Sequence, residues 1–308
     1  MAMMSTLSNV GVWIVLGIVC AILIGPIGDI SSTLIVFVLI IQMTLSMDGM
    51  SFSAKTLKES KKPIIYSVIA CFGISTVTAL LMGSFFMADY PEIWKGWVML
   101  AAVPCAVSVV MVSFFSKGNT TMCVLSVAAI YLIALILTPL ITRVLIGESV
   151  SVLKIFSYVI LFVAVPMAAS VPLKKVKISR NARVIVINAM LFLLVFMSLG
   201  QNREYLFSDT GIVLIIAAAS AVRVFGVSFA VLFFLKKKGV GRDDSMVYIP
   251  MAVWKNSGLG VTLCFVLFGS MAEAAIPCAI SLLVELLWFA VVAGRIEKVW
   301  PNPSPTDG

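Results

Sequence analysis

The stretch Met246-Val-Tyr-Ile-Pro250-Met-Ala-Val-Trp-Lys255-Asn-Ser-Gly258 places a proline, a lysine and a glycine inside an apolar run that extends to Phe268. Almost half a chain earlier, the apolar run Trp97–Phe115 carries Pro104 in its interior. Proline removes a helical hydrogen bond and glycine loosens a helix, so both runs are predicted to be interrupted. Interrupted membrane helices at corresponding places in two halves free backbone N–H and C=O groups at the bilayer midplane, which is typical of secondary transporters.

The composition places the chain in a lipid bilayer. It has 308 residues, of which 61% are hydrophobic and 12% charged, and its mean hydropathy is +1.14. A soluble fold of this size could not bury so much apolar surface. The net charge of +8 comes from basic residues in the loops and not from one aromatic-rich patch, so nucleic-acid binding is not expected.

Cysteine and histidine usage narrows the chemistry further. All six cysteines lie inside hydrophobic runs without a Cys-x-x-Cys pair, so neither a disulfide framework nor a zinc site is predicted. Histidine, the commonest metal ligand and proton relay, is absent from the sequence. The sequence also lacks paired buried carboxylates and a glycine-rich phosphate loop. We therefore expect no enzyme activity, no cofactor and no bound metal.

Runs of about 18–25 apolar residues predict an all-α integral membrane protein with ten transmembrane helices. The predicted spans are 8–25, 30–50, 63–87, 97–115, 120–145, 153–171, 184–199, 210–235, 246–268 and 274–293. If the N-terminus is cytoplasmic, the inside loops carry sixteen Lys and Arg residues and the opposite loops four. The positive-inside rule therefore favours cytoplasmic N- and C-termini. The expected location is the cell (inner) membrane.

The ten spans divide into two halves, residues 1–148 and 149–308, with five spans in each. Because five is odd, the second five-helix repeat is predicted to be inverted relative to the first. The two interrupted segments are then the fourth span of each half, and we expect them to cross. Residues 301–308 are predicted to form a disordered tail.

Four ionisable residues, Asp48, Arg223, Lys255 and Glu285, fall at or near membrane depth. Buried charge is costly, so each needs a partner or a role. One interpretation is that Glu285 pairs with Arg223 or Lys255 and only supports helix packing. Lys255, however, directly precedes Asn256-Ser257-Gly258 at an expected break, where a cation packs poorly. At mid-depth, where Asp48 does not lie, the two cations outnumber Glu285 by one, which leaves room for an anionic solute.

The predicted site follows from these two breaks. The expected solute-binding residues are Lys255, Asn256, Ser257, Pro104, Cys105 and Ser108, and the expected ion-coupling residues are Lys255 and Glu285. Asn119 is equally compatible with a site residue and with the tight turn after the fourth span. Thr138-Pro139 is predicted to have a structural role as a kink in the fifth span.

Several motifs resemble the bile acid:sodium symporter family. They are Gln42–Met47, Val103–Ala106, Ser116–Asn119, Leu137–Leu140 and Lys255–Leu259. The resemblance implies ten helices in two inverted repeats, arranged as a panel domain and a core domain in which the discontinuous helices cross. It also implies transport of organic anions, such as bile acids, steroid conjugates and small carboxylates, together with sodium.

The chain departs from that family at the sodium ligands. In the fourth helix the family has a Ser-Asn pair where this chain has Val109-Val110, and in the fifth it has a Ser and a Thr where this chain has Cys123 and Val127. In the ninth helix the family's glutamate and glutamine fall at Met251 and Lys255. A third-helix glutamine falls at Cys71. Sodium prefers hard oxygen ligands, which valine, methionine and cysteine side chains do not supply. The resemblance therefore implies a divergent member in which the Lys255 ammonium stands where a bound cation would be.

Four functions remain open at this point. The preferred one is a sodium-independent carrier of a small or amphipathic organic anion that works by alternating access, with Lys255 as fixed charge or proton carrier. The second is sodium symport with displaced ligands. The third is metalloid efflux, because Cys105 lies fourteen residues before Asn119 as in arsenite permeases, although Gly258 replaces the glutamate that those proteins need. The fourth is a non-transporting membrane sensor. Substrate, direction and oligomeric state are not predicted.

Overall fold

The computed structural model describes residues 10–26, 30–46, 61–147, 151–173, 175–176, 178–201, 203–269, 272–293 and 300. Every regular element within these residues is a helix. Six helical segments of the described chain are long and apolar enough to cross a membrane: Lys61–Ser84, Thr120–Ile146, Leu153–Leu173, Asn181–Gln201, Thr210–Lys237 and Glu273–Val291. The prediction of an all-helical membrane protein is therefore confirmed. Asp48 and the tail 301–308 lie outside the described residues.

The helices of the first half follow the predicted apolar runs. They are α2 (Val10–Ile24), α3 (Ile30–Ser46), α5 (Lys61–Val68), the π-helix η1 (Ile69–Ser75), α6 (Thr76–Ser84), α7 (Pro91–Ala102), α8 (Val109–Phe115) and α9 (Thr120–Ile146). The fourth apolar segment begins at Pro91, earlier than the predicted residue 97. Proline is favoured there because the first helical position has no N–H bond to lose.

The helices of the second half contain two further π-helices. The elements are α10 (Val152–Val159), the π-helix η3 (Ile160–Ala164), α11 (Val165–Leu173), α12 (Arg180–Gln201), α13 (Arg203–Ser208), α14 (Thr210–Ala221), the π-helix η4 (Val222–Gly226), α15 (Val227–Lys237), α16 (Arg242–Val253), α17 (Ser257–Phe268), the 3₁₀-helix η5 (Ala272–Ala275) and α18 (Ile276–Ala293). A π-helix is rare and often occurs at functional sites, so the residues around η1 and η4 are candidates for a functional site.

Both segments that were predicted to break, the one with Pro104 and the one with Pro250, are interrupted. α7 ends at Ala102, and Val103 is extended, with φ −71° and ψ 154°. α16 ends at Val253, and Trp254 is extended, with φ −105° and ψ 102°. Pro250 lies inside α16, so this helix breaks only after the next turn and not at the proline itself.

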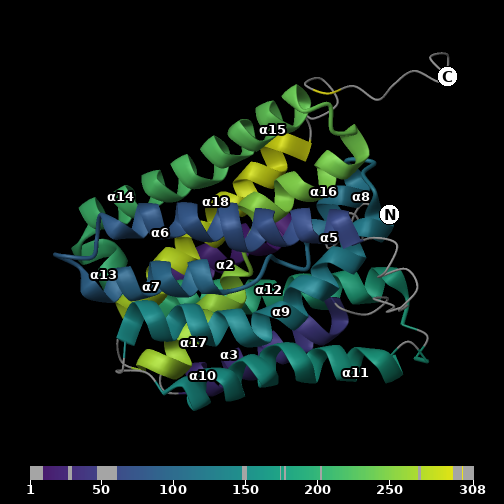
Figure 1. Cartoon of the computed structure of the whole chain (residues 1–308). Coiled ribbons are helices and arrows are strands. Elements are labelled where there is room, and N and C mark those ends of the chain that lie inside the picture. Colours follow the sequence, from purple (N-terminus) through teal and green to yellow (C-terminus); the bar gives the residue numbers. More distant parts are fainter. Residues whose placement is uncertain are drawn as a thin grey trace.

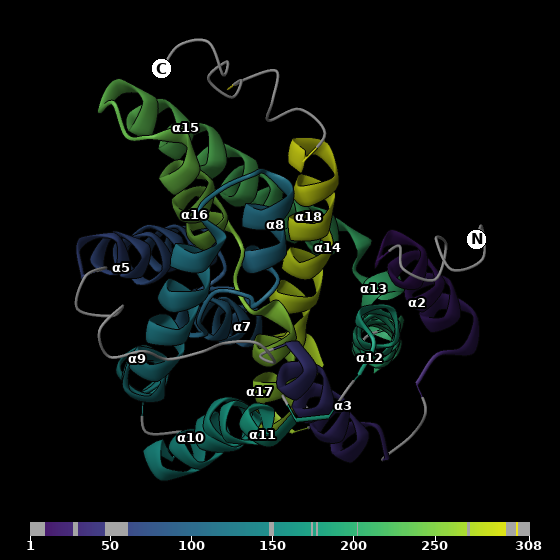
Figure 2. The ribbon, with the colours of Figure 1, turned by 90° about the vertical axis from the view of Figure 1, so that its right-hand side faces the viewer.

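The helices lie roughly side by side, and the interrupted ones are in the middle. α2 packs against α12, and α12 packs against α3. Figure 2 shows α2, α3 and α12 on one side of α17 and α18, with α5 and α9 on the other. α7, α17 and α18 contact one another, and α16 contacts α8 and η1 (Figure 1). The two breaks are thus enclosed by helices from both halves of the chain.

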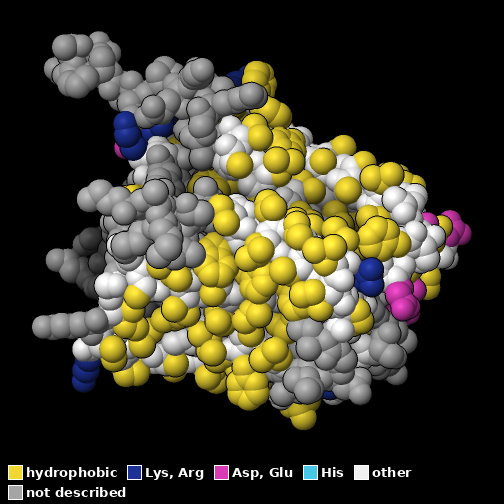
Figure 3. All heavy atoms as spheres, turned by 180° about the vertical axis from the view of Figure 1, so that it is seen from behind, with side chains coloured by type: hydrophobic (Ala, Val, Ile, Leu, Met, Phe, Trp, Pro, Cys, Tyr) yellow, Lys and Arg dark blue, Asp and Glu magenta, His cyan; other side chains and the backbone are white. Residues whose placement is uncertain are grey.

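The outer surface suits a bilayer. On the face drawn in Figure 3, hydrophobic side chains cover the middle, and the charged ones lie toward its two ends. Large exposed hydrophobic residues occur on many helices, for example Phe85, Ile136 and Phe233, which are 69–76% exposed. An apolar belt with charged ends is the distribution that the hydrocarbon core and its two polar interfaces favour.

Candidate ion and solute site at the helix breaks

The two breaks meet and satisfy each other's backbone groups. Asn256 N donates to Pro104 O at 2.7 Å, and Ala106 N donates to Trp254 O at 3.1 Å. Cys105 and Lys255 thereby form an antiparallel bridge. Backbone groups that leave a helix need such partners when water is excluded. These particular groups, which we expected to face a solute, bind one another in this structure.

The Lys255 ammonium is enclosed by oxygen atoms of the first break. Its Nζ donates to Ala101 O at 2.9 Å, to Val103 O at 2.9 Å and to Thr76 Oγ1 at 3.0 Å. The residue is 0% exposed, and Nζ also lies 5.0 Å from the centre of the Phe72 ring, a cation–π contact. An ammonium has three hydrogens to donate, so all of them are used.

The last two carbonyls of α7 have side-chain donors. Thr76 Oγ1 donates to Ala101 O at 2.8 Å, and Thr138 Oγ1 donates to Ala102 O at 2.8 Å. The last carbonyls of a helix have no intrahelical partner, and burial without one is costly. The break can therefore be buried inside the protein because its carbonyls accept hydrogen bonds from Lys255, Thr76 and Thr138.

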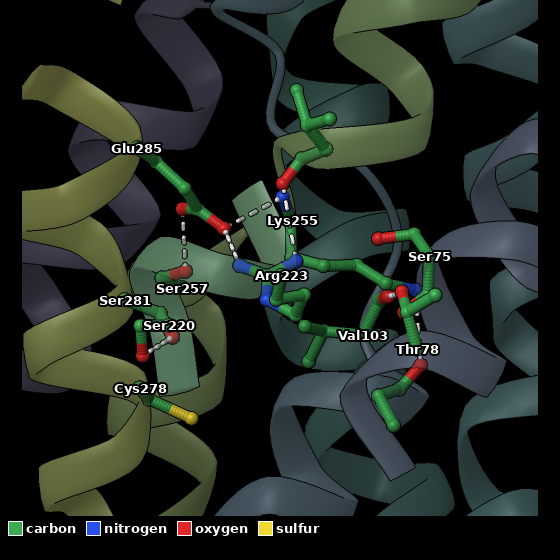
Figure 4. A network of polar contacts seen from close by, with 12 residues as sticks. Ser75, Thr78, Val103, Ser220, Arg223, Lys255, Ser257, Cys278, Ser281 and Glu285 are labelled. Carbon is green, nitrogen blue, oxygen red and sulfur yellow. Dashed lines mark hydrogen bonds and ion pairs between the residues drawn. The ribbon is translucent and has the colours of Figure 1, made fainter. Parts of the chain in front are cut away.

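An ion pair holds the second break. Arg223, in η4, donates from NH1 to Val253 O at 3.1 Å and from NH2 to Glu285 Oε1 at 2.6 Å. Glu285, in α18, also accepts from Lys255 N at 3.2 Å and from Ser257 Oγ at 2.8 Å. Figure 4 shows Arg223 between Glu285 and the break, with Lys255 extending toward Val103. The side chains of the pair are 0% exposed.

The buried charges do not balance within the described residues around the breaks. Lys255 and Arg223 carry two positive charges, and Glu285 carries one negative charge. Because none of these side chains reaches water, their charges are weakly screened. With all three groups ionised, the crossing carries one net positive charge in an apolar core.

Asn256 and Ser257 lie at the start of α17, where Asn256 is the N-cap and Ser257 is the first helical residue. Asn256 Oδ1 accepts from Leu259 N at 3.0 Å and caps α17, and its Nδ2 donates to Tyr131 OH at 2.8 Å. Ser257 is bound to Glu285. Among the predicted solute-binding residues, Ser108 differs, because its side chain is exposed at the start of α8. Pro104 and Cys105 are buried.

The positions that the resemblance matches to sodium ligands of the family pack as core. Cys71, Val109, Cys123, Val127 and Met251 are all 0% exposed. Their apolar or sulfur side chains offer no hard oxygen to an alkali ion. The partners that the ammonium uses instead are two backbone carbonyls and one hydroxyl.

Sequence reasoning did not identify Thr76, Thr138 and Tyr131 as members of this network. Thr138 is predicted to have a structural role at a kink, and its hydroxyl also binds the end of α7. Asn119 forms the turn: its side chain accepts from Met122 N at 3.1 Å, and its own N–H donates to Asp243 O at 3.0 Å. A polar residue in an apolar helix was the only available signal for the threonines.

Interrupted apolar helices with buried charges at their crossing are typical of multi-pass membrane transporters. A family model, the Sodium Bile acid symporter family, matches residues 33–209, more than half of the chain. The chain belongs to this family, which confirms the resemblance of its motifs. It is also 24% identical over 271 residues to "Probable sodium/metabolite cotransporter BASS1, chloroplastic" of Arabidopsis thaliana. That match covers 85% of this chain and 64% of the relative.

Proposed function

We propose that this protein is a sodium-independent carrier of an organic anion that works by alternating access. The observation that supports it is the environment of the Lys255 ammonium. Three oxygens surround it: two backbone carbonyls of the first break and the hydroxyl of Thr76 in α6. In a sodium-coupled carrier an alkali ion would have to bring this charge to the crossing. Here the chain itself supplies it.

The geometry of these contacts suits an ammonium in place of an ion. Lysine is a compact point charge whose hydrogens point in three directions, so it can bind three separate oxygens as a small cation does. The oxygens of Ala101 and Val103 belong to a helix end, where the peptide dipoles favour positive charge. An ammonium in this position cannot leave, so no sodium is needed for the crossing to stay charged.

Two repeated features support an inverted five-helix repeat. The third predicted span of each half contains a π-helix, η1 in one and η4 in the other, and the fourth is interrupted. In our proposal α2, α3 and α10–α12 form the panel domain, and the remaining helices form the core domain. Inverted repeats around a midplane site are the basis of alternating access in many carriers.

The exposure of the crossing suggests how a solute reaches it. Ser108 is exposed, and Met111 and Phe114, further along α8, are 40% and 51% exposed. On the panel side, Met43 accepts a contact from Asn256 Nδ2 at 3.4 Å and is 4% exposed, and Leu194 is 2% exposed. We propose that the solute enters along α8 and meets Ser108 and Asn256, while Lys255 and Arg223 attract its negative charge from within the core.

Uptake into proteoliposomes tests this function. We expect a bile acid or a small carboxylate such as pyruvate to enter at the same rate when choline replaces sodium. The Lys255→Gln variant should lose at least about tenfold in rate, because an amide supplies neither the charge nor three donors. Lys238→Gln, at an exposed loop position, serves as the control.

Two results would contradict the proposal. Uptake by the wild type that depends strongly on sodium would instead support a symporter with displaced ligands. Saturable binding of the anion without flux would support a membrane sensor of the same family.

A further inference from the structure

The second break contains a group of oxygen atoms arranged around Arg223. Val253 O lies 3.1 Å from NH1 and Glu285 Oε1 lies 2.6 Å from NH2, and Glu285 Oε2 accepts from Ser257 Oγ. The carbonyl belongs to the last residue of α16, the end of the helix at which the peptide dipoles favour a cation. A carboxylate and a carbonyl are hard ligands of the kind that bind monovalent cations.

The guanidinium of Arg223 binds its two oxygen ligands differently from an arginine that only forms an ion pair between packed helices. An arginine that serves an ion pair alone typically binds both oxygens of one carboxylate in parallel. Here NH1 and NH2 bind two different groups from two different helices, and Nε has no hydrogen-bond partner although it is buried. The cation thus joins α16 to α18 as a bound ion would join its ligands.

We infer that the Val253 carbonyl and the Glu285 carboxylate form a second monovalent-cation site, which the guanidinium of Arg223 fills permanently. The side chain reaches the site from η4 because this π-helix carries Arg223 among α16 and α18. The inference extends the proposed function, in which Lys255 fills the first site, but it concerns a different residue and helix break. Its chemical consequence is that a free cation can enter once the arginine side chain is removed.

Removal of Arg223 leaves a space with a defined chemistry. The Arg223→Ala variant keeps the Glu285 carboxyl group and frees the Val253 carbonyl, and it opens a volume shaped for a planar cation. Free guanidinium, at millimolar and therefore non-denaturing concentration, is the matching probe. Sodium is a second probe, because the oxygens are hard, and choline is a control that is too large for a buried site.

The experiment measures thermal unfolding of purified full-length protein in detergent. We expect Arg223→Ala to unfold at lower temperature than the wild type and guanidinium to restore part of the loss. Sodium should restore less, because it cannot donate two directed hydrogen bonds, and choline should restore nothing. In Arg223→Ala/Glu285→Gln the effect of guanidinium should disappear. Arg203→Ala, at an exposed position of α13, should not respond to any of the three.

Each contrary result overturns the inference. It fails if guanidinium does not raise the unfolding temperature of Arg223→Ala, or if choline raises it equally. If the variant is too unstable to purify alone, it is purified with guanidinium and then dialysed. We then expect the variant to aggregate when guanidinium is removed by dialysis. The inference is overturned if the variant stays soluble and folded after dialysis, or if it cannot be purified even with guanidinium. The readout is stability, so it does not depend on whether anion uptake proves to be sodium-independent.

Discussion

At the scale of single residues, three consecutive carbonyls lose their helical partners where α7 ends, and different side chains bind them. Lys255 and Thr76 bind Ala101 O, Thr138 binds Ala102 O, and Lys255 binds Val103 O. Each donor comes from a separate part of the chain. The end of α7 is therefore stable only when the surrounding helices are in place.

Replacement of Thr138 by valine should destabilise the protein. The change keeps the shape of the side chain but leaves the buried Ala102 carbonyl without its donor, which costs about 1–3 kcal/mol. We expect a lower unfolding temperature in detergent. Thr78→Val is the control, since Thr78 Oγ1 donates to Ile74 O, a carbonyl of its own preceding turn. Equal losses in the two variants would contradict this role of Thr138.

The sequence could identify Lys255 but not these threonines. A lysine beside Asn-Ser-Gly in an apolar run is costly enough to require a role. A threonine in an apolar helix ordinarily binds a carbonyl of its own preceding turn, as Thr78 does with Ile74 O at 2.8 Å. Like Thr78, Thr76 and Thr138 lie in apolar helices. Only the tertiary structure shows that their hydroxyl groups bind carbonyls of another helix.

At the scale of elements, α7 packs closely against η5 and α18. A Cβ atom added at Gly96 would overlap Ala274 O and approach Pro277 Cδ to 2.8 Å. The carbonyl of Gly96 also accepts from Cys278 Sγ at 3.5 Å. This contact fixes the first half-helix against the last helix of the chain, and thus fixes the position of the break.

Gly96→Ala should therefore be harmful and Gly226→Ala should not. The backbone oxygen of Ala274 cannot move aside, so we expect a loss of about 1–3 kcal/mol at Gly96. At Gly226, in η4, an added Cβ meets nothing within 4 Å. Thermal unfolding of the two variants side by side measures the difference. A Gly96→Ala variant as stable as the wild type would show that α7 can shift away from α18.

The elements themselves were predicted well, and their irregularities less well. Apolar runs and prolines predicted the helices and both interruptions, because these depend on local chemistry. The position of the second break was not predicted by Pro250, because a helix can continue for a turn beyond a proline. Here α16 ends at Val253. The π-helices η1 and η4 have no residue signature, and they became visible only in the structure.

At the scale of the whole molecule, the inverted repeat and the orientation remain predictions that cysteine labelling can test. Among the native cysteines, Cys20 is partly exposed and the others are buried. In a Cys20→Ala background we expect an impermeant thiol reagent to label Lys238→Cys from the cytoplasmic side and Lys154→Cys from the opposite side. Both positions are exposed. Labelling of both from the same side would contradict the predicted number of spans between them.

Ser108→Cys then reports the open side of the carrier. Because exposed α8 residues lead from Ser108 toward the loop at Lys117, the same reagent should reach this cysteine from the side that labels Lys238→Cys. A saturating organic anion should slow the labelling at least about threefold, because it occupies the same space. Labelling only from the side of Lys154→Cys would show that the carrier is open to the opposite face of the membrane.

The attachment of the ammonium to the chain at Lys255 has an energetic consequence. A sodium ion leaves with its cargo and brings the work of its gradient, whereas a tethered charge that crosses with an anion must cross back without it. In the proposed carrier, if the ammonium keeps its proton throughout, only the anion moves over a complete cycle. The membrane voltage and the two anion concentrations alone then set the direction, and 100 mV, negative inside, opposes entry of a monovalent anion by about 2.3 kcal/mol. Such a carrier favours export.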